Sequence, residues 1–342
     1  MRIVSAEDSD LGRWNAFVAE HPEATFFHRY EWANIVREAF GHRTHYLLAE
    51  GEDGRVTGIL PLARVKSRLF GDTLSSVPFQ PYAGAVAEDE ATRHALEDAA
   101  VALAEELQVG SLELRLRAPS GRGWPTKDLY VNFEKPVSAD REENLKAIPR
   151  KQRAMVRKAI KAGLEYRIDE GLDDFFEMYS RSLHALGTPA FPRRYFQIIR
   201  ETFPEESEIL TVTHEGRPVA SVLSYYFRDR VMPYYGGGVR QARALKANDF
   251  MYWSLMCHAV ETRGVRVFDY GRSKKGTGSY SFKKNWGFEP TPLHYEYHLV
   301  RDRAMPDVNP ANPKYRLFIK LWQRLPYPVT LALGPHLVKY LG

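Results

Sequence analysis

The residues best suited to chemistry lie between Phe268 and Phe288, where cations, glycines and aromatic side chains alternate. β-forming residues lead up to Gly271, and the loop after it carries Arg272, Lys274 and Lys275. Glycine lets backbone N–H groups approach an anion closely, and lysine and arginine supply the opposite charge. This composition at a strand end predicts an anion-binding site. The alternative is a solvated basic hairpin, which has no need of the interleaved aromatic residues Tyr270, Tyr280, Phe282 and Trp286.

The elements that must position this loop recur earlier in the chain. Residues 45–115 and 209–270 both predict a hairpin, a further strand, a helix and a final strand. The turns at Asp53-Gly54 and Glu215-Gly216 are typical of hairpins, and Gly110 and Gly264 end the two helices, predicted at 88–108 and 248–263. A duplicated α+β unit is favoured over two unrelated α+β units. We therefore expect one domain at 1–135, a second at 136–302, and a tail at 303–342.

The chain length supports two domains, because 342 residues are more than one hydrophobic core ordinarily accommodates. The net charge of +5 favours anionic partners. A single cysteine, Cys257, allows no intrachain disulfide, and its helical surroundings predict a core residue. Metal-ligand spacings are absent, so we expect no metal and no permanently bound cofactor. The first residues lack a signal-peptide pattern and no apolar run of about 18 residues exists, which predicts a cytoplasmic protein.

A basic helix is predicted at 148–162. Its apolar residues recur at helical spacing, and seven cations with no acid fall between Lys146 and Lys161. Such a face is usually only solvated, but this excess of cations favours contact with phosphate, with Arg153 and Arg157 as candidates.

The tail begins with a proline-marked linker and continues as an amphipathic helix. Leu317, Leu321 and Trp322 lie on its apolar face, whereas Lys320 and Arg324 share the other. The tail is expected either to dock on the first domain or to rest, through 314–342, on an anionic membrane surface.

Several segments together resemble the FemAB family of aminoacyl transferases, which are built from two GNAT-like acyltransferase domains. The resemblance spans about residues 20–300, and the run from Gly271 to Phe288 is most similar to the branch associated with exosortase and PEP-CTERM systems of exopolysaccharide-producing bacteria. Its other segments are Phe26–Trp32, the basic helix with Arg153 and Arg157, Tyr234–Gly238, and Asp269–Gly271.

The resemblance implies an acyltransferase that moves an aminoacyl or other acyl group to an amine or hydroxyl of a cell-envelope or exopolysaccharide precursor. Characterised members use aminoacyl-tRNA and extend peptidoglycan precursors in the cytoplasm. This sequence lacks their long coiled-coil arm, and its loop is more cationic. By resemblance, Lys283 stabilises the tetrahedral intermediate, Asp269 orients the acceptor or takes its proton, and Tyr235 hydrogen-bonds the reacting carbonyl. The expected substrate-binding residues are Arg272, Lys274, Lys275, Tyr234, Gly236, Gly237, Tyr280, Arg153 and Arg157.

The acyl donor is either a charged tRNA or acyl-CoA. GNAT enzymes hold the CoA pyrophosphate on a glycine-rich turn before a helix, and residues 238–248 lack that glycine pattern. Arg240, Arg243 and Lys246 keep the CoA alternative open, because their side chains could bind phosphates. Two other functions remain as alternatives: acyl-CoA-dependent acetylation of a polysaccharide, and a non-catalytic GNAT-derived protein that binds nucleic acid or anionic lipid at the inner face of the membrane.

Overall fold

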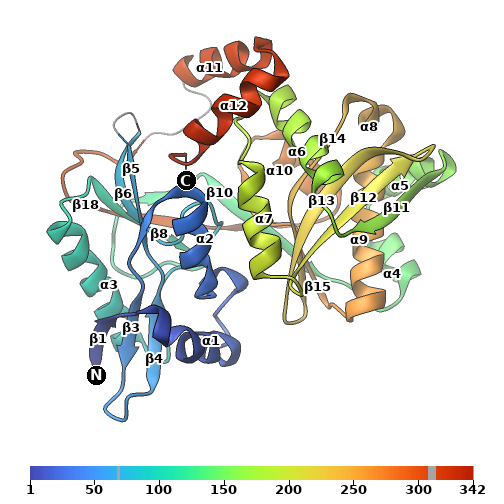
Figure 1. Ribbon diagram of the computed structural model, residues 1–342. Coiled ribbons are helices and arrows are strands. Elements are labelled where there is room, and N and C mark those ends of the chain that lie inside the picture. Colours follow the sequence, from blue (N-terminus) through green and yellow to red (C-terminus); the bar gives the residue numbers. More distant parts are fainter. Residues whose placement is uncertain (68–69, 307–312, 342) are drawn as a thin grey trace. The chain divides into compact units, whose positions relative to one another are not determined.

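The computed structural model describes residues 1–67, 70–306 and 313–341, and the chain forms two compact units (Figure 1). Unit 1 comprises Met1–Tyr130, Pro292–Asp307 and Lys339–Gly342, and unit 2 comprises Val131–Thr291 and Val308–Val338. The expected end of the second domain at residue 302 differs from this division, because the strand His294–Leu299 pairs with Ser111–Leu116 of unit 1.

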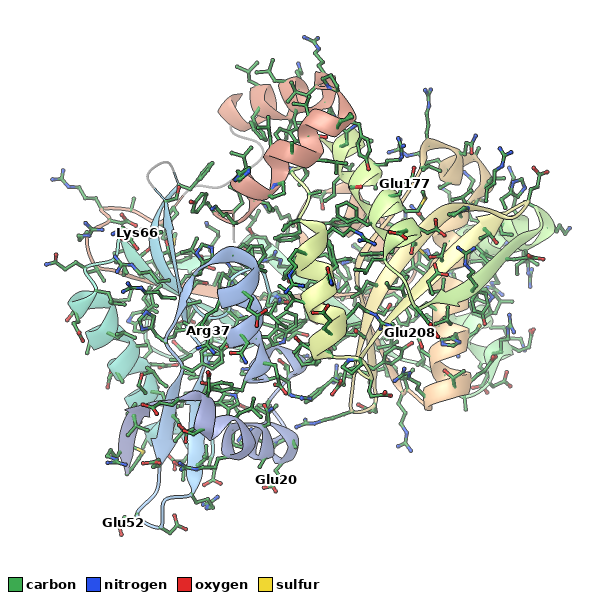
Figure 2. All side chains as sticks on the ribbon, in the orientation of Figure 1. Glu20, Arg37, Glu52, Lys66, Glu177 and Glu208 are labelled. Atoms are coloured by element: carbon green, nitrogen blue, oxygen red, sulfur yellow. The ribbon has the colours of Figure 1, made fainter. Side chains whose placement is uncertain are left out.

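Unit 1 contains two sheets in the part of the chain that is described. One has the strand order β1-β3-β4-β7 and the other has the order β2-β5-β6-β8-β18-β9. The β3–β4 hairpin turns at Glu52–Gly54, and the Glu52 side chain points away from the sheet (Figure 2). The strands are β1 Arg2–Ser5, β2 Arg43–Thr44, β3 Leu47–Glu50, β4 Val56–Leu60, β5 Ala63–Ser67, β6 Gly71–Ser75, β7 Val86–Ala87, β8 Ser111–Leu116, β9 Thr126–Lys127 and β18 His294–Leu299.

Helices α1 (Leu11–Glu20), α2 (Glu31–Phe40) and α3 (Glu90–Glu106) also belong to unit 1. Leucine and alanine side chains of α3 form a buried core with those of β3, β6 and β8. The Phe26–Trp32 motif is structural, since the Trp32 indole donates to the Phe26 carbonyl oxygen at 3.0 Å and both residues are fully buried.

Unit 2 is built on one mixed sheet with the order β11-β12-β13-β14-β15-β10-β16, and β17 also pairs with β10. Long β-branched and aromatic runs give β12 and β13 their length, and a turn at Glu215-Gly216 joins them. The strands are β10 Tyr130–Pro136, β11 Leu164–Asp169, β12 Ser207–His214, β13 Arg217–Phe227, β14 Arg230–Gly238, β15 Val267–Asp269, β16 Ser273–Lys274 and β17 Pro290–Pro292.

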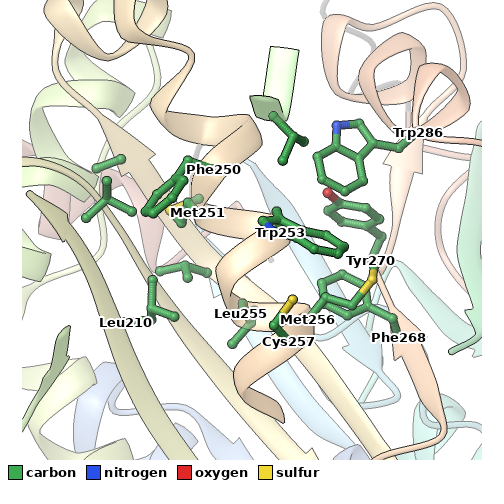
Figure 3. Packing of buried hydrophobic residues seen from close by; sticks show 14 of the residues in the cluster. Leu210, Phe250, Met251, Trp253, Leu255, Met256, Cys257, Phe268, Tyr270 and Trp286 are labelled. Atoms are coloured by element: carbon green, nitrogen blue, oxygen red, sulfur yellow. The ribbon is translucent and has the colours of Figure 1, made fainter. Parts of the chain in front are cut away.

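Several helices of unit 2 pack on this sheet. Among them α9 contributes the most residues to the core, and its Phe250, Met251 and Trp253 pack with Phe268 of β15 and Trp286 (Figure 3). Cys257 is also buried here, where burial raises the pKa of its thiol to about 12. The helices are α4 Arg141–Ala147, α5 Arg150–Lys161, α6 Asp173–Leu186, α7 Arg193–Thr202, α8 Arg240–Leu245, α9 Ala247–Arg263, α10 Gly278–Asn285, α11 Pro313–Arg324 and α12 Tyr327–Val338.

The two units repeat one order of elements, as the duplicated turns and helices predict. In unit 1, β3, β4–β5 and β6 precede α3, and β8 then pairs in parallel with β6. In unit 2, β12, β13 and β14 precede α9, and β15 then pairs in parallel with β14. The predicted α+β fold and its duplication are confirmed.

The amphipathic tail folds as α11 and α12, and it packs on α6. The His184 ring bonds the Leu325 carbonyl oxygen at 3.0 Å, and Gln323 donates to the Ala185 carbonyl oxygen at 2.9 Å. The expectation that the tail docks on the first domain is therefore wrong for these two helices, because their buried face, with Trp322, fits α6 of unit 2.

Candidate active site

Helix α10 places Lys283 over the end of β15. The helix begins at Thr277, whose side-chain oxygen accepts a hydrogen bond from the Tyr280 N–H at 3.3 Å. Two turns later, Lys283 is only 9% exposed and donates from Nζ to the carbonyl oxygens of Gly271 at 2.9 Å and Arg272 at 3.0 Å. A buried ammonium group thus lies where the strand passes into the cationic loop.

Burial lowers the pKa of Lys283 to about 7, which the charge of Arg272 reinforces and the charge of Asp269 opposes. A lysine in this range holds or releases a proton near neutral pH. As an ammonium it can donate to an oxygen that becomes negative during a reaction.

Asp269 is the last residue of β15, and it is fixed by neighbours on two segments. Its Oδ1 accepts from Asn132 Nδ2 at 3.1 Å and from the Gly271 N–H at 2.8 Å. Gly271 has φ +67°, a left-handed conformation that residues with a Cβ rarely adopt. This conformation allows one residue to bond Asp269 through its N–H and Lys283 through its carbonyl oxygen.

Three buried polar atoms around this strand end have no hydrogen-bond partner among the described residues. They are Asn132 Oδ1, the Tyr270 hydroxyl and Ser273 Oγ. Buried polar atoms are nearly always bonded, so such a group marks a place where a substrate or water can bind. Sequence reasoning missed Asn132 and Ser273, and Asn132 lies 137 residues before its partner Asp269.

Strand β14 diverges from β15 close to this site. The two strands pair only at Arg230 with Val267 and at Val231 with Phe268, whereas β14 continues to Gly238. A register shift against β13 leaves Tyr234 as an extra residue, which is a β-bulge. Bulges take a backbone group out of the ladder and redirect side chains, which suits the edge of a binding site.

Tyr235 and the glycines after it are held by helices on one face of the sheet. The Tyr235 hydroxyl bonds the Tyr195 hydroxyl at 2.9 Å, and burial raises the pKa of Tyr235 well above its usual value. A Cβ on Gly237 would lie 2.5 Å from the Cβ of Ser182, so this glycine lets α6 approach β14. Packing thus explains Gly237, and Gly236 similarly faces the backbone of β13. Substrate roles for these residues and for Tyr234 stay predictions.

The cations of the loop lie next to Lys283. Arg272 and Lys274 are half-buried and Lys275 is exposed. Burial, with the charge of Arg272, lowers the pKa of Lys274. The Tyr280 ring packs edge-on against Phe133 at 5.4 Å, so it contributes to the wall of this region.

Arg153 and Arg157 lie on α5, which packs on α9. Arg157 is exposed, and Arg153 Nε is buried with no hydrogen-bond partner among the described residues.

The buried carboxylate of Asp249, in the first turn of α9, connects α5 to the end of α10. Asp249 accepts from Gln152 of α5 and, at 3.1 Å, from the Trp286 indole. Trp286, one of the aromatic residues interleaved with the cations in the sequence, is fully buried and is a core residue.

Residues 150–284 match the acetyltransferase (GNAT) domain family. The fold is similar to that of FemX, with a TM-score of 0.67 at 16% identity over 93% of this chain and 100% of that one. It is also similar to that of L-PGS from Bacillus licheniformis, with a TM-score of 0.56 at 12% identity over 94% of this chain and 98% of that one. A third match is a tandem GNAT protein from the clavulanic acid biosynthesis pathway, with a TM-score of 0.55 at 14% identity over 86% of this chain and 97% of that one. A search of curated protein sequences found no match.

Residues 150–284 therefore form a GNAT acetyltransferase domain, and the chain as a whole has a fold similar to those of FemX and of a tandem GNAT protein. The similarity to the fold of FemX agrees with the FemAB resemblance that the sequence motifs indicate. Within the described ranges, no helix is both long and apolar enough to cross a bilayer, and no cluster of three metal-ligating side chains occurs.

Proposed function

We propose that the chain transfers an aminoacyl group from a charged tRNA to an amine or hydroxyl of a cell-envelope or exopolysaccharide precursor, with the reaction centre at the end of β15. The observation that carries this proposal is the buried Lys283 ammonium group beside Asp269. The two residues place a donor for an oxyanion close to an acceptor for a proton.

The transfer follows from these two groups. The acceptor nitrogen or oxygen attacks the ester carbonyl carbon, and the new bond leaves a negative charge on the carbonyl oxygen. Lys283 donates a hydrogen bond to that oxygen, and Asp269 takes the proton of the attacking group. The intermediate then expels the ribose oxygen of the tRNA, which leaves as a hydroxyl after it receives the proton from Asp269. The ester bond is broken and an amide or a new ester is formed.

Asp249 supports a tRNA donor over acyl-CoA. A helix N-terminus binds pyrophosphate because its N–H groups and dipole favour negative charge. In α9 the first turn already carries the Asp249 carboxylate, which is buried and accepts from Gln152 and Trp286. Burial raises the pKa of Asp249, but its hydrogen bonds and the charge of Lys246 oppose this and favour the anionic form. A pyrophosphate at this turn would meet a like charge.

The second candidate is transfer from acyl-CoA. It is favoured by the match of residues 150–284 to an acetyltransferase domain. Arg240, Arg243 and Lys246 lie on and after α8, directly before α9, where they could hold CoA phosphates by side chain.

Titration calorimetry of the full chain with charged tRNA, uncharged tRNA and acetyl-CoA distinguishes the two donors. We expect charged tRNA to bind and acetyl-CoA to give no saturable heat. The matched variant Asp249→Asn removes the negative charge from α9 and should leave tRNA binding unchanged. Saturable binding of acetyl-CoA to the wild type, with none of charged tRNA, would assign the chain to the second candidate.

A further inference from the structure

The two C-terminal helices expose an unusual amount of apolar side chain. Of the eleven large apolar residues that are exposed among those described, five lie on α11, on α12 or at the adjoining end of α6: Leu186, Leu317, Leu321, Val329 and Leu333. Leu317 is 60% exposed and Leu321 is 54% exposed, one helical turn apart on α11. Val329 and Leu333 have the same spacing on α12. Exposed apolar residues that are clustered, rather than scattered singly, mark an interaction surface.

This exposure is not a consequence of poor packing. The opposite faces of the same helices are anchored on α6 through the bonds to His184 and Ala185, and through Ser180 Oγ, which lies 2.8 Å from the Tyr327 hydroxyl. Gly187, after α6, lets α11 approach, since a Cβ there would lie 2.6 Å from the Ile319 side chain. The helices are thus held with one face in the protein and their leucines outward.

The charge of the same segment has one sign. Residues 308–342 contain five lysines and arginines and neither aspartate nor glutamate. These five equal the formal net charge of the whole chain, +5, so the first 307 residues are balanced. Lys320 and Arg324 are exposed on the same side of α11 as Leu317 and Leu321, so the predicted separation of these leucines from the two cations on opposite faces is wrong. No charged residue occurs from Leu325 to Pro335.

We propose that α11 and α12 bind the surface of an anionic lipid bilayer, with their exposed leucines among the lipid headgroups and acyl boundary, and Lys320 and Arg324 against the headgroup charges. Apolar side chains flanked by cations are what an interfacial helix needs, because burial of the first and attraction of the second add together. A nucleic acid would use the cations but leave the leucines exposed to water. A second copy of the chain would meet a face of its own charge.

Co-sedimentation of the full chain with vesicles tests this partner. The wild type binds vesicles of phosphatidylcholine with about one third phosphatidylglycerol, and binds neutral phosphatidylcholine vesicles at least tenfold more weakly. The variant L317Q/L321Q/L333Q loses binding to anionic vesicles, since it removes the apolar side chains that enter the bilayer. The variant K320E/R324E weakens it by at least about 25-fold, because each cation near such a surface contributes about a factor of five and the two glutamates are repelled by it.

The control is I160Q/I168Q, which removes two apolar residues that are also exposed, on α5 and β11. It binds vesicles like the wild type. All the substituted residues are exposed, so the variants keep the wild-type circular dichroism and melting temperature. Vesicle binding needs no turnover and is therefore independent of the proposed reaction.

Four results overturn the proposal. The first is a wild type that stays in the supernatant with anionic vesicles. The second is a leucine variant that still sediments with them. The third is a wild-type dimer in solution that L317Q/L321Q/L333Q converts to a monomer without any vesicle binding, which would assign the face to a second copy. Binding of tRNA that only K320E/R324E abolishes, with no vesicle binding, would equally assign it to nucleic acid.

Discussion

Lys283 Nζ donates to the carbonyl oxygen of Gly271 over 2.9 Å, and this bond joins helix α10 to the end of β15. The same glycine donates its N–H to Asp269. One backbone residue thus fixes both groups to which we assign the chemistry. The arrangement buries an amine and lowers its pKa, which has consequences for stability as well as for reaction.

The stability of unit 2 is expected to rise with pH because of Lys283. Its folded-state pKa of about 7 lies below the ordinary value of 10.5, so the unfolded chain binds more protons between these pH values. The free energy of unfolding of the wild type, relative to Lys283→Met, should increase by up to about 1.4 kcal/mol per pH unit from pH 7 to pH 10. Urea denaturation of both proteins from pH 7 to pH 10 measures this difference in unfolding free energy. A difference that does not change with pH would show that Lys283 has an ordinary pKa.

For Glu97 of α3 we expect the opposite effect: its contribution to the stability of unit 1 falls as pH rises. The side chain is 1% exposed, neither of its oxygens has a hydrogen-bond partner among the described residues, and burial raises its pKa to about 7. Arg93, His94 and Arg122 oppose this shift, and the Glu296 carboxylate adds to it. Because the folded chain binds the extra proton, the stability contributed by Glu97 is lost as pH rises from about 4.5 to about 7.

The variant Glu97→Gln cannot lose this proton and should not show that decline. Its free energy of unfolding should therefore grow relative to the wild type by roughly 1 kcal/mol per pH unit at most between pH 5 and 7. The check is thermal unfolding of both proteins at pH 5, 6, 7 and 8. Parallel curves would mean that Glu97 titrates like an exposed carboxyl group.

Gly237→Ala should destabilise unit 2 by about 1–3 kcal/mol, the usual cost of overpacking. The added Cβ would lie 2.5 Å from Ser182 Cβ and 2.8 Å from the Met178 carbonyl oxygen, so α6 must shift. Gly171→Ala is the matched control, because a Cβ there meets nothing within 4 Å. Equal melting temperatures for the two variants would contradict the packing explanation of the glycine run.

The cationic loop should bind the phosphates of the substrate. Replacing Arg272, Lys274 and Lys275 together by Gln is expected to raise KM at least tenfold and to flatten its salt dependence, because the loop loses three charges whose attraction for phosphate is weakened by salt. The comparison variant carries Gln at Arg150, Lys158 and Lys161 of α5, which are exposed. If the α5 variant alone shows the loss, the phosphate site lies on that helix.

The sequence was sufficient for the repeated hairpins and helices. The Glu215-Gly216 turn, the helix after Lys246 and its end at Gly264 are local signals, and β12–β13, α9 and the left-handed Gly264 lie where these signals place them. The cationic loop after Gly271 was also visible, because charge and glycine content are properties of neighbouring residues.

The partners of the site could not be found in this way. Asn132 reaches Asp269 only because β10 crosses to pair with β15, and Gln152 reaches Asp249 only because α5 packs on α9. Such contacts depend on which strands and helices become neighbours in the fold, and the local sequence around each residue does not show this. The Tyr234–Gly238 run shows the converse, since a motif that suggested a ligand is explained at Gly237 by the approach of α6.

The most direct test of the account is the rate of aminoacyl transfer by Lys283→Ala. The assay follows labelled aminoacyl groups from a charged tRNA pool into an extract of bacterial envelope precursors, with the exposed neighbour variant Lys284→Ala as control. Loss of one oxyanion donor typically lowers kcat by about 10²–10³, so Lys283→Ala should fall by that factor while Lys284→Ala stays near the wild type. Transfer by a folded Lys283→Ala at the wild-type rate would contradict a reaction centre at the end of β15.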